Sequence, residues 1–385
     1  MMTKTNELAT KLEKRISASV DKGWQQDKEG KLRAVGCISF KEFMAACLYD
    51  DEYGYYRSGP VRIGKNGDFY TSSGIGAIMA EVLARYALAY ANAEESQIQL
   101  VEWGAGTGRL SAQIAAAGRT LDMNWESRFS SVLVEDHPMH REAVQRSYRE
   151  LAGRECAEPL LLSSKEAWDS GILKRKSLVL ANELLDAFPV HRVAMQDGEL
   201  VELGVGWSKE QGFYEVYMPV TDPRLVHWLE SDGISLKEGQ RTEVHAAAYD
   251  FLQRLRGDMP SGRLVLIDYG HEAEEYAAEH RRLGTLMCYW KHQASGNPYV
   301  RIGVQDITSH VPFTFVRRAA EDAGWKLAGY TTQKQFLLDN GVLGLLQSHD
   351  GSDPFGEAAR INRAVRQLLL SDEMSEAFKV MVLDA

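Results

Sequence analysis

The sequence contains little cysteine and no long apolar run. Its 385 residues include four cysteines: Cys37, Cys47, Cys156 and Cys288. No two of them have the C-x-x-C spacing that is typical of zinc knuckles and dithiol redox sites, so neither class of site is indicated. No stretch approaches the roughly 18 consecutive apolar residues that a membrane-spanning helix requires. The sequence therefore predicts no membrane association.

An excess of positive charge is also lacking. The chain carries 44 Lys and Arg against 54 Asp and Glu, which gives a net charge of −10 at pH 7. Sequence-independent binding of nucleic acid depends on Lys and Arg contacts with phosphate, so this composition disfavours a nucleic-acid partner. An acidic surface suits a protein partner that presents arginine or lysine. The length allows one large domain with insertions or two domains.

The N-terminal segment does not have the composition of a targeting peptide. Transit peptides are poor in acidic residues, whereas this segment contains Glu7 and Glu13, and it has no apolar secretory core. Apolar residues recur at helical spacing and predict an amphipathic helix: Leu8, Leu12, Ile16 and Val20. Together with the few cysteines, which suit a reducing compartment, this pattern predicts a cytoplasmic location.

The ten histidines are scattered along the chain. His137 and His140 would place two imidazoles on one face of a helix, but no third ligand accompanies them. We therefore predict no metal site.

A glycine-rich turn follows a short apolar run that ends in an acid. Residues 100–103 precede Gly104, Gly106 and Gly108, and residues 110–117 then have a helical pattern. This arrangement predicts a strand–turn–helix unit, in which glycine lets the backbone approach a ligand and the helix N-terminus offers free N–H groups. The dinucleotide fingerprint would need glycine at position 109, which is Arg109, so a nicotinamide dehydrogenase is disfavoured.

Two acidic residues indicate which ligand this turn binds. Glu102 precedes the first glycine by two residues and suits a ligand with a cationic amine, such as S-adenosylmethionine (SAM). Glu135 ends the next apolar run, and an acid there accepts the ribose hydroxyls in nucleotide-binding α/β folds. It follows the turn at more than the usual separation of about 20 residues, which predicts a longer intervening helix or loop. The alternative for Glu135 is a carboxylate that caps the helix near Pro138.

The remaining pattern predicts an α/β fold. Short apolar runs indicate buried strands at 98–103, 131–135, 159–162, 177–182 and 264–270. They alternate with helical segments, as in a Rossmann-like, mostly parallel sheet with helices on both faces and an antiparallel edge strand at 376–382. Residues 190–220 predict an inserted β-meander, followed by helices at 222–232 and 243–257. Residues 286–308 form a second insertion, either a lid or an ordinary loop.

These elements predict four regions. Residues 1–95 form an N-terminal helical region with a cofactor-contacting loop, and residues 96–189 form the first part of the core. Residues 190–260 form an inserted subdomain for a substrate or partner, and residues 261–385 complete the core. Insertions beside a cofactor site commonly carry specificity.

A second group of polar residues follows the strand predicted at 177–182. Asn182, Glu183 and Asp186 stand at its carboxyl end, where open α/β sheets bind their ligands. Two carboxylates close together suit a guanidinium, which presents planar, paired donors. The alternative is that Glu183 and Asp186 cap the following turn and pair with Arg192. The tetrapeptide of amino-methylating DNA enzymes is absent here, so a DNA base is disfavoured as acceptor.

Several motifs resemble those of the MidA-like family of SAM-dependent methyltransferases, which includes the mitochondrial complex I assembly arginine methyltransferase. The resemblance spans roughly residues 40 to 382. Its motifs include Gly54-Tyr55-Tyr56, Gly67-Asp68-Phe69-Tyr70-Thr71-Ser72, the glycine turn, Asn182-Glu183 with Asp186-Ala187-Phe188-Pro189, and Gln305-Asp306-Ile307-Thr308. The resemblance implies SAM as cofactor and a protein arginine as acceptor. It also implies that the loop containing Asp68, Tyr70, Thr71 and Ser72 lies against the methionine end of SAM.

The sequence departs from the family at two places. Ser73-Gly74 stands where the family usually has Pro-Glu, and Val244-His245 stands where it commonly has Ser/Cys-Pro. These departures bear on the identity of the acceptor more than on SAM.

The resulting hypothesis is a SAM-dependent methyltransferase that acts on a protein arginine. Glu183, with Asp186 or Asn182, would orient the guanidinium and accept its proton. The alternatives are methylation of a small molecule or another side chain, and a non-catalytic SAM-binding assembly factor. The sequence leaves the oligomeric state open, with a homodimer as one option.

Overall fold

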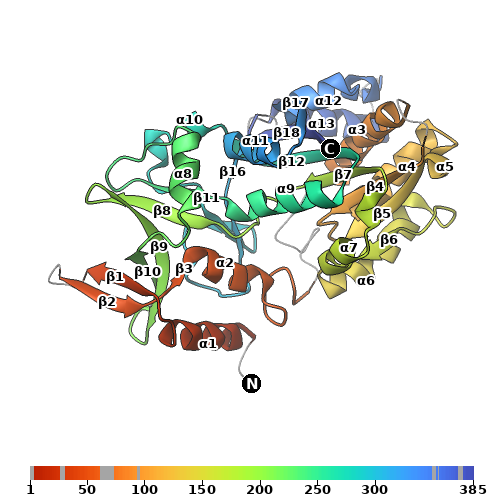
Figure 1. The fold of residues 1–385 in the computed structure, drawn as a ribbon. Coiled ribbons are helices and arrows are strands. Elements are labelled where there is room, and N and C mark those ends of the chain that lie inside the picture. Colours follow the sequence, from red (N-terminus) through yellow and green to blue (C-terminus); the bar gives the residue numbers. More distant parts are fainter. Residues whose placement is uncertain are drawn as a thin grey trace. The chain divides into compact units, whose positions relative to one another are not determined.

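The computed structural model describes residues 4–26, 31–60, 73–92, 96–348, 353, 355–371 and 376–385. Figure 1 labels the helices and strands along the chain. The chain divides into two compact units. The first comprises Met1–Gly59, Leu185–Leu252 and Gly270–Ala319, and the second comprises Pro60–Leu184, Gln253–Tyr269 and Ala320–Ala385. The 286–308 insertion and most of the 190–260 insertion therefore belong to the same unit as the N-terminal region.

The second unit contains a mostly parallel sheet with the strand order β17-β18-β12-β7-β4-β5-β6. Its strands are β4 (Ile98–Trp103), β5 (Phe129–Val134), β6 (Leu160–Leu162), β7 (Ser177–Asn182), β12 (Gly262–His271), β17 (Lys326–Thr332) and β18 (Phe378–Asp384). Its helices are α3 (Ser73–Asn92), α4 (Arg109–Leu121), α5 (Trp125–Arg128), α6 (Pro138–Ser147), η1 (Tyr148–Ala152), α7 (Ser164–Asp169), η2 (Ile172–Lys174), α12 (Gln333–Asp339), η4 (Val342–Leu345) and α13 (Glu357–Leu370). Two helices, α9 (Ala246–Asp258) and α11 (Phe313–Asp322), run from the first unit into the second.

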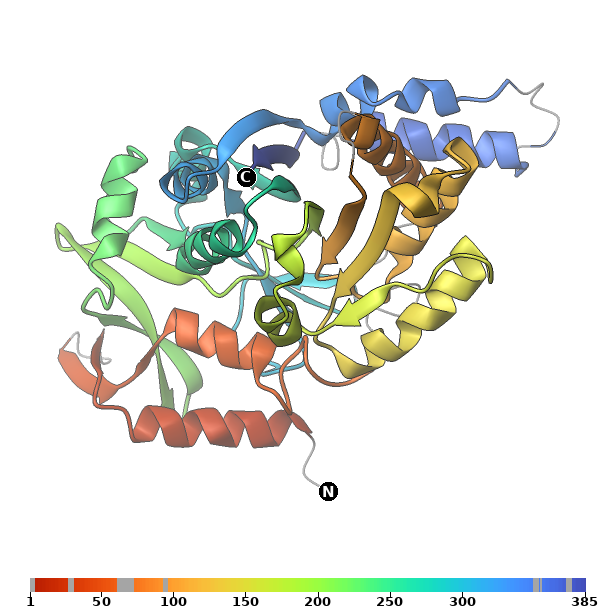
Figure 2. The same cartoon turned by 45° about the vertical axis from the view of Figure 1, so that its right-hand side comes forward.

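Helices cover both faces of this sheet (Figure 2). On one face, alternate residues of β4 and β7, such as Leu100 and Leu180, join a buried cluster with α3 and α13. On the other face, Trp168 of α7 packs against Trp103, with ring centroids 4.3 Å apart, and against the Arg254 guanidinium of α9. Strands buried on both faces explain the continuous apolar runs from which β4 and β7 were predicted.

The strand order reverses at the centre of the sheet. The chain runs outward from β4 to β5 and β6 and then returns to β7 on the other side of β4, all in parallel. Ligands of open α/β sheets bind outside the carboxyl ends of the strands at such a switch point. Those ends carry the glycine turn, Glu135 and Asn182. The predicted Rossmann-like arrangement is confirmed.

The prediction of the last strand is corrected in one respect. Residues 376–382 were expected to form an edge strand, but β18 pairs with β12 on one side and with β17 on the other, so β17 is the edge. Four consecutive residues of β18, from Val380 to Leu383, are buried. Such a run suits an inner strand, whereas β17 is exposed along its first half.

The first unit contains an antiparallel sheet with the order β11-β8-β9-β10-β1-β2, and β3 pairs with β9. Its elements are α1 (Lys4–Ser17), β1 (Lys22–Gln26), β2 (Leu32–Gly36), β3 (Ile38–Ser39), α2 (Phe40–Tyr49), β8 (His191–Gln196), β9 (Glu199–Ser208), β10 (Gly212–Met218), α8 (Arg224–Ser231), β11 (Arg241–Val244), α10 (Ala273–Tyr276), η3 (Glu279–Arg281) and β16 (Val311–Pro312). The strands β8, β9 and β10 form the predicted meander. The hairpin β1–β2, which extends it, was not predicted.

The 286–308 segment forms its own sheet in this unit. Its strands β13 (Met287–Trp290), β14 (Gln293–Ser295) and β15 (Asp306–Thr308) pair antiparallel, with β13 in the centre. The helix α2 contacts β8, β9 and β15.

Two predicted helices have different limits. The first helix ends at Ser17, and Val20 lies beyond it with 89% of its surface exposed. The helix expected at 243–257 begins at Ala246, because residues 241–244 pair with β8 as β11.

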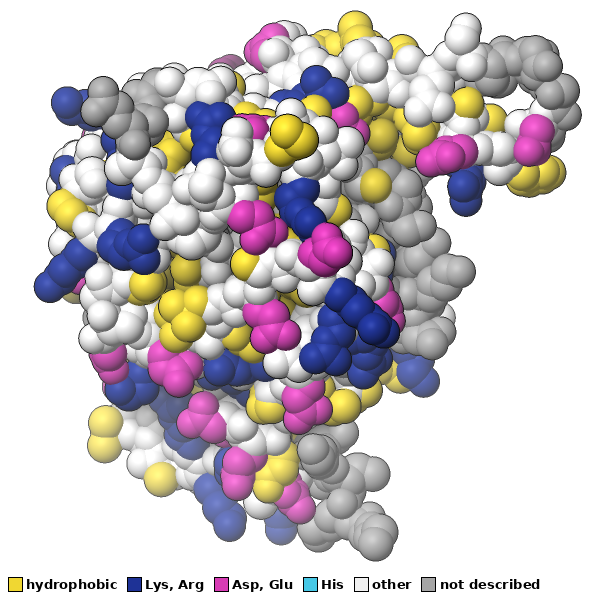
Figure 3. All heavy atoms as spheres, turned by 90° about the vertical axis from the view of Figure 1, so that its right-hand side faces the viewer, with side chains coloured by type: hydrophobic (Ala, Val, Ile, Leu, Met, Phe, Trp, Pro, Cys, Tyr) yellow, Lys and Arg dark blue, Asp and Glu magenta, His cyan; other side chains and the backbone are white. Residues whose placement is uncertain are grey.

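Within the described ranges, no helix combines the length and apolarity needed to cross a membrane. Figure 3 shows one face of the molecule, where acidic and basic side chains are interspersed.

Candidate functional site

The glycine turn after β4 has a backbone that only glycine adopts readily. Gly104, Gly106 and Gly108 have φ angles of +75°, +55° and +70°, in the left-handed region. A Cβ atom on Gly108 would lie 2.9 Å from Leu133. The turn is tied to β5, because the Gly104 N–H donates to the Val134 carbonyl at 2.9 Å. The predicted strand–turn–helix unit is therefore present, and α4 begins directly after Gly108.

Glu135 joins this turn to the next one. Its Oε2 accepts a hydrogen bond from the Gly106 N–H at 2.6 Å, and its Oε1 accepts one from the His137 N–H at 2.7 Å. His137 is the N-cap residue of α6. The carboxylate thus bonds the start of that helix, as the capping alternative proposed, and also reaches the glycine turn.

Glu102 is buried at the end of β4. It accepts hydrogen bonds from the backbone N–H of Ser111, at 3.1 Å, and from the Ser111 hydroxyl. Burial raises the pKa of Glu102 to about 7; the bonds from Ser111 oppose this shift and the charge of Glu135 adds to it. Ser111 was not predicted as a site residue. Its position in the first turn of the helix after the glycines is the signal that could have found it.

The two histidines of the 137–140 pair lie beside Glu135. Their rings stack with centroids 4.2 Å apart, and His140 Nδ1 lies 3.7 Å from Glu135 Oε1. Across the described part of the chain, no group of three or more His, Cys, Asp or Glu side chains could hold a metal ion.

Asn182 and Glu183 lie together at the carboxyl end of β7. Asn182 Nδ2 is 3.5 Å from Glu183 Oε1, and the Glu183 N–H donates to the Ile267 carbonyl at 2.8 Å. Glu183 has a φ angle of +49°, which is rare for a residue with a side chain and costs energy that the surrounding structure must offset. Its side chain is exposed. Backbone strain of this kind is often found at functional sites.

Asp186 belongs to the first unit, and its side chain is buried there. Its carbonyl accepts a hydrogen bond from the Ser309 N–H at 3.0 Å. Arg192, which the alternative interpretation paired with Glu183 and Asp186, forms ion pairs with Glu215 at 3.2 Å and Glu243 at 3.4 Å.

The other predicted cofactor residues, Asp68, Tyr70, Thr71 and Ser72, lie outside the described residues.

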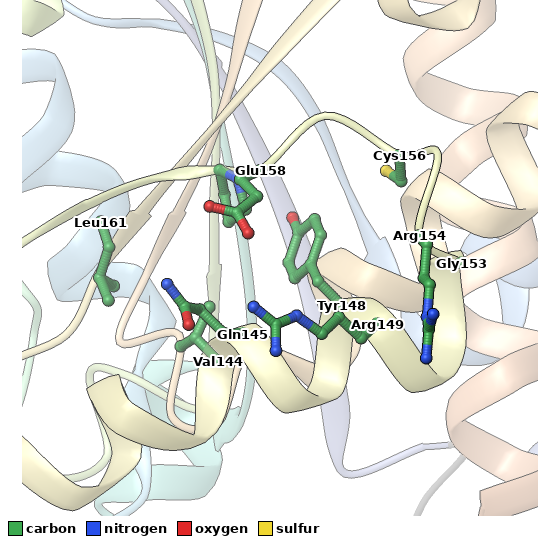
Figure 4. A pocket seen from close by; sticks show the side chains of 10 residues that line it. Val144, Gln145, Tyr148, Arg149, Gly153, Arg154, Cys156, Glu158 and Leu161 are labelled. Atoms are coloured by element: carbon green, nitrogen blue, oxygen red, sulfur yellow. The ribbon is translucent and has the colours of Figure 1, made fainter.

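A separate open pocket of about 420 Å³ lies over α6, η1 and residues 153–161 (Figure 4). The side chains of Tyr148, Arg149 and Cys156 are among those that line it. None of the predicted site residues lines this pocket, so it is distinct from the strand ends.

The residues at the strand ends fit SAM. The three left-handed glycines leave room for close approach of a ligand, and two carboxylates end adjacent strands on either side of the turn. An acid beside such a turn suits the amine of SAM, and an acid after the second strand suits its ribose.

Solved structures share the fold of this chain. A COG1565 superfamily member from Burkholderia thailandensis, crystallised with S-adenosyl-homocysteine, is 31% identical, with a TM-score of 0.85 over 99% of this chain and 92% of that chain. A second structure from the same organism, also 31% identical, has a TM-score of 0.82 with the same coverage.

Curated relatives are more distant. The protein named "Protein arginine methyltransferase NDUFAF7, mitochondrial" from Danio rerio is 26% identical, over 94% of this chain and 87% of the relative. Its human counterpart is 24% identical, over 81% of this chain and 72% of the relative. Both are named as mitochondrial proteins, and these names overturn the cytoplasmic location that we expected.

The profile of the Methyltransf_28 family, described as S-adenosyl-L-methionine-dependent methyltransferases, matches residues 81–331. The chain therefore belongs to this family of SAM-dependent methyltransferases, and SAM is its cofactor.

Proposed function

We propose that the protein transfers the methyl group of SAM to a nitrogen of arginine in a protein. The observation that carries this proposal is the exposed carboxylate of Glu183, held with Asn182 at the carboxyl end of β7 on strained backbone. The arginine-methylating activity in the names of the curated relatives supports the choice of acceptor.

Bound SAM supplies a methyl group that its sulfonium already activates, so transfer requires chiefly alignment of the acceptor. A protonated guanidinium is a poor nucleophile. In this proposal, Glu183 accepts hydrogen bonds from the guanidinium, orients one nitrogen and takes its proton as the new N–C bond forms. Asn182 holds the Glu183 carboxylate.

The remaining predicted residues would bind the cofactor. The N–H groups of the glycine turn and the carboxylate of Glu102 would hold the methionine end of SAM, and Glu135 would hold the ribose. The residues Asp68, Tyr70, Thr71 and Ser72 would complete the methionine end. In the same proposal, residues 190–260 recognise the acceptor protein.

The test is methyl transfer by the full-length protein from methyl-labelled SAM to proteins of a cell extract. Glu183→Gln keeps the shape of the side chain and removes its charge, so transfer to arginine should fall about 100- to 10,000-fold. Binding of SAM should stay within about threefold of the wild-type value, since Glu183 does not contact the cofactor in this scheme. Glu321→Gln, a change of an exposed glutamate on α11, is the matched control.

Unchanged transfer in Glu183→Gln would contradict the assigned role. Label that appears only in a small molecule or on another side chain would favour the second hypothesis. Binding of SAM without transfer to any acceptor would favour a non-catalytic SAM-binding protein.

A further inference from the structure

Within the first unit, Tyr56 and Asp306 form a hydrogen bond that joins segments far apart in the sequence. The Tyr56 hydroxyl donates to Asp306 Oδ1 at 2.8 Å, and the same oxygen accepts the Ile307 N–H at 2.9 Å. Asp306 is fully buried, whereas Tyr56 is half-buried. The carboxylate holds the Tyr56 hydroxyl, and the Tyr55 ring packs against the Tyr56 ring in a T-shaped contact with the centroids 5.0 Å apart.

Tyr49, the last residue of α2, stacks on this ring. The two ring centroids are 5.6 Å apart, and the planes differ by 26°. The Tyr49 hydroxyl donates to the carbonyl of Ala187 at 3.0 Å. Each hydroxyl thus has a fixed acceptor, Asp306 for Tyr56 and the Ala187 carbonyl for Tyr49. We call these two half-buried, stacked rings the Tyr49–Tyr56 face.

The same contacts bring this face to the segment that carries Asp186. Ala187 follows Asp186 directly, and the Asp186 carbonyl is held by the N–H of Ser309, three residues after Asp306. Burial raises the pKa of the Tyr56 phenol well above its ordinary value, and the charges of Asp306 and Asp186 raise it further. The phenol therefore stays neutral, and two carboxylates give its surroundings a negative potential.

Rings and carboxylates in this arrangement suit one class of cation. A guanidinium is planar and weakly hydrated, and it stacks on aromatic rings while its edges bond to carboxylates. An ammonium group is compact and strongly hydrated, so it gains less from a flat ring at a partly buried position.

We propose that the Tyr49–Tyr56 face determines the specificity of acceptor binding by stacking against a planar guanidinium, and that Asp306 is a positioning residue that acts through Tyr56. This inference rests on the proposed arginine methylation, and all the residues that it names belong to the first unit. Asp306 needs no direct contact with the acceptor, because its carboxylate is buried and bonded to Tyr56.

The first test measures recognition without catalysis. The full-length protein is labelled with 3-fluorotyrosine, and the ¹⁹F signals are assigned with Tyr49→Phe, Tyr56→Phe and Tyr55→Phe. Ethylguanidinium should shift the Tyr49 and Tyr56 signals saturably, and ethylammonium at the same concentration should bind at least about fivefold more weakly. The signal of Tyr55, which is only 1% exposed, should stay unchanged. Equal shifts with both cations, or no shift of either ring, would overturn the proposal.

This titration is independent of methyl transfer. A positive titration beside a negative transfer assay would leave guanidinium recognition standing and contradict arginine methylation. A negative titration beside arginine methylation would overturn only the role of the Tyr49–Tyr56 face.

The second test separates positioning from direct charge. Asp306→Asn keeps an oxygen that can accept from Tyr56 and Ile307, whereas Asp306→Ala removes it. Asp306→Ala should raise KM for an arginine-bearing protein substrate about tenfold, with SAM affinity unchanged. The KM of Asp306→Asn should stay close to the wild-type value. Tyr55→Phe is the control. Equal damage in both Asp306 variants, or an unchanged KM in both, would overturn the positioning role.

Discussion

Glu135 and Gly106 are joined by a hydrogen bond of 2.6 Å between a carboxylate and a backbone N–H, across 29 residues of sequence. The bond connects the turns that follow two adjacent parallel strands, β4 and β5. One carboxylate thereby orients the glycine turn and also bonds the start of α6. The path of the glycine turn depends on this bond as well as on the glycines themselves.

Replacement of Gly106 by valine should abolish SAM binding. The φ angle of +55° is strained for any side chain and most of all for a β-branched one, so the turn must change its path. Titration calorimetry should show at least about a hundredfold loss of affinity. Gly198→Val is the matched control, because Gly198 has a φ angle of +78° in a turn with open space around its Cβ position. If Gly198→Val lost a comparable amount of SAM affinity, the loss in Gly106→Val would reflect general destabilisation of the protein and not a change at the glycine turn.

Glu102 should make both stability and SAM affinity depend on pH. Its pKa is about 7 in the folded protein against 4.5 when unperturbed. Between pH 4.5 and 7, Glu102 keeps its proton in the folded protein but has lost it in the unfolded chain. The stability of the folded protein that depends on the protonated carboxyl group is therefore fully present below pH 4.5 and is lost as the pH rises through 7. The denaturant concentration at the unfolding midpoint of the wild type, compared with that of Glu102→Gln, should therefore fall as the pH rises from 4.5 to 7.5. A constant difference between the two proteins would contradict the assigned shift.

Affinity for SAM should change in the opposite direction. The amine of SAM is a cation and favours the ionised form of Glu102, so binding to the wild type should tighten as pH rises through about 7. In Glu102→Gln, calorimetry should show weaker binding without this rise. A rise of equal size in the variant would place the titrating group elsewhere.

Arg192 should be important for stability. Its guanidinium is buried and pairs with Glu243, which is fully buried and also accepts from the Thr285 N–H at 2.7 Å. Removing one member of a buried pair leaves an uncompensated charge, so Arg192→Met should cost about 3–5 kcal/mol of unfolding free energy. Arg224→Met removes a half-exposed pair with Asp222 and should cost less than about 1 kcal/mol. Urea denaturation of Arg192→Met and Arg224→Met measures the two losses of unfolding free energy. Equal urea midpoints for the two variants would contradict the importance of Arg192.

His245 should make the protein sensitive to acid. Burial lowers its pKa to about 3 from 6.5, and a hydrogen bond from the imidazole to the His310 backbone opposes this shift. The stability that this neutral imidazole contributes is therefore present above pH 6.5 and is lost as pH falls toward 3. His245→Gln should be less acid-sensitive than the wild type between pH 6.5 and 4.5. The control variant His227→Gln changes an exposed histidine and should leave the pH dependence of stability unaltered. The same acid sensitivity in His245→Gln and His227→Gln would refute the prediction.

Elements encoded by local patterns were predicted well. β4 and β7 were located to the residue, because strands buried on both faces are short and rich in apolar residues. The glycine turn and the strand-end acids follow from the same local rules.

Features that depend on distant pairing were not predictable. The inner position of β18 depends on β12 and β17, which precede it in the chain by more than forty residues. The hairpin β1–β2 has few apolar positions of its own, and its first strand pairs with β10, so no local pattern predicted it. The bond between Tyr56 and Asp306 spans 250 residues, and no local spacing predicts it.

The most direct test of the central claim is the identity of the methylated atom. Full-length protein and its Glu183→Gln variant would be incubated with methyl-labelled SAM and proteins from cells that lack the gene, and the labelled products would be hydrolysed to amino acids. The account predicts labelled methylarginine with the wild type and at most about one hundredth as much with the variant. Label that is confined to another amino acid, or equal methylarginine with both proteins, would contradict it.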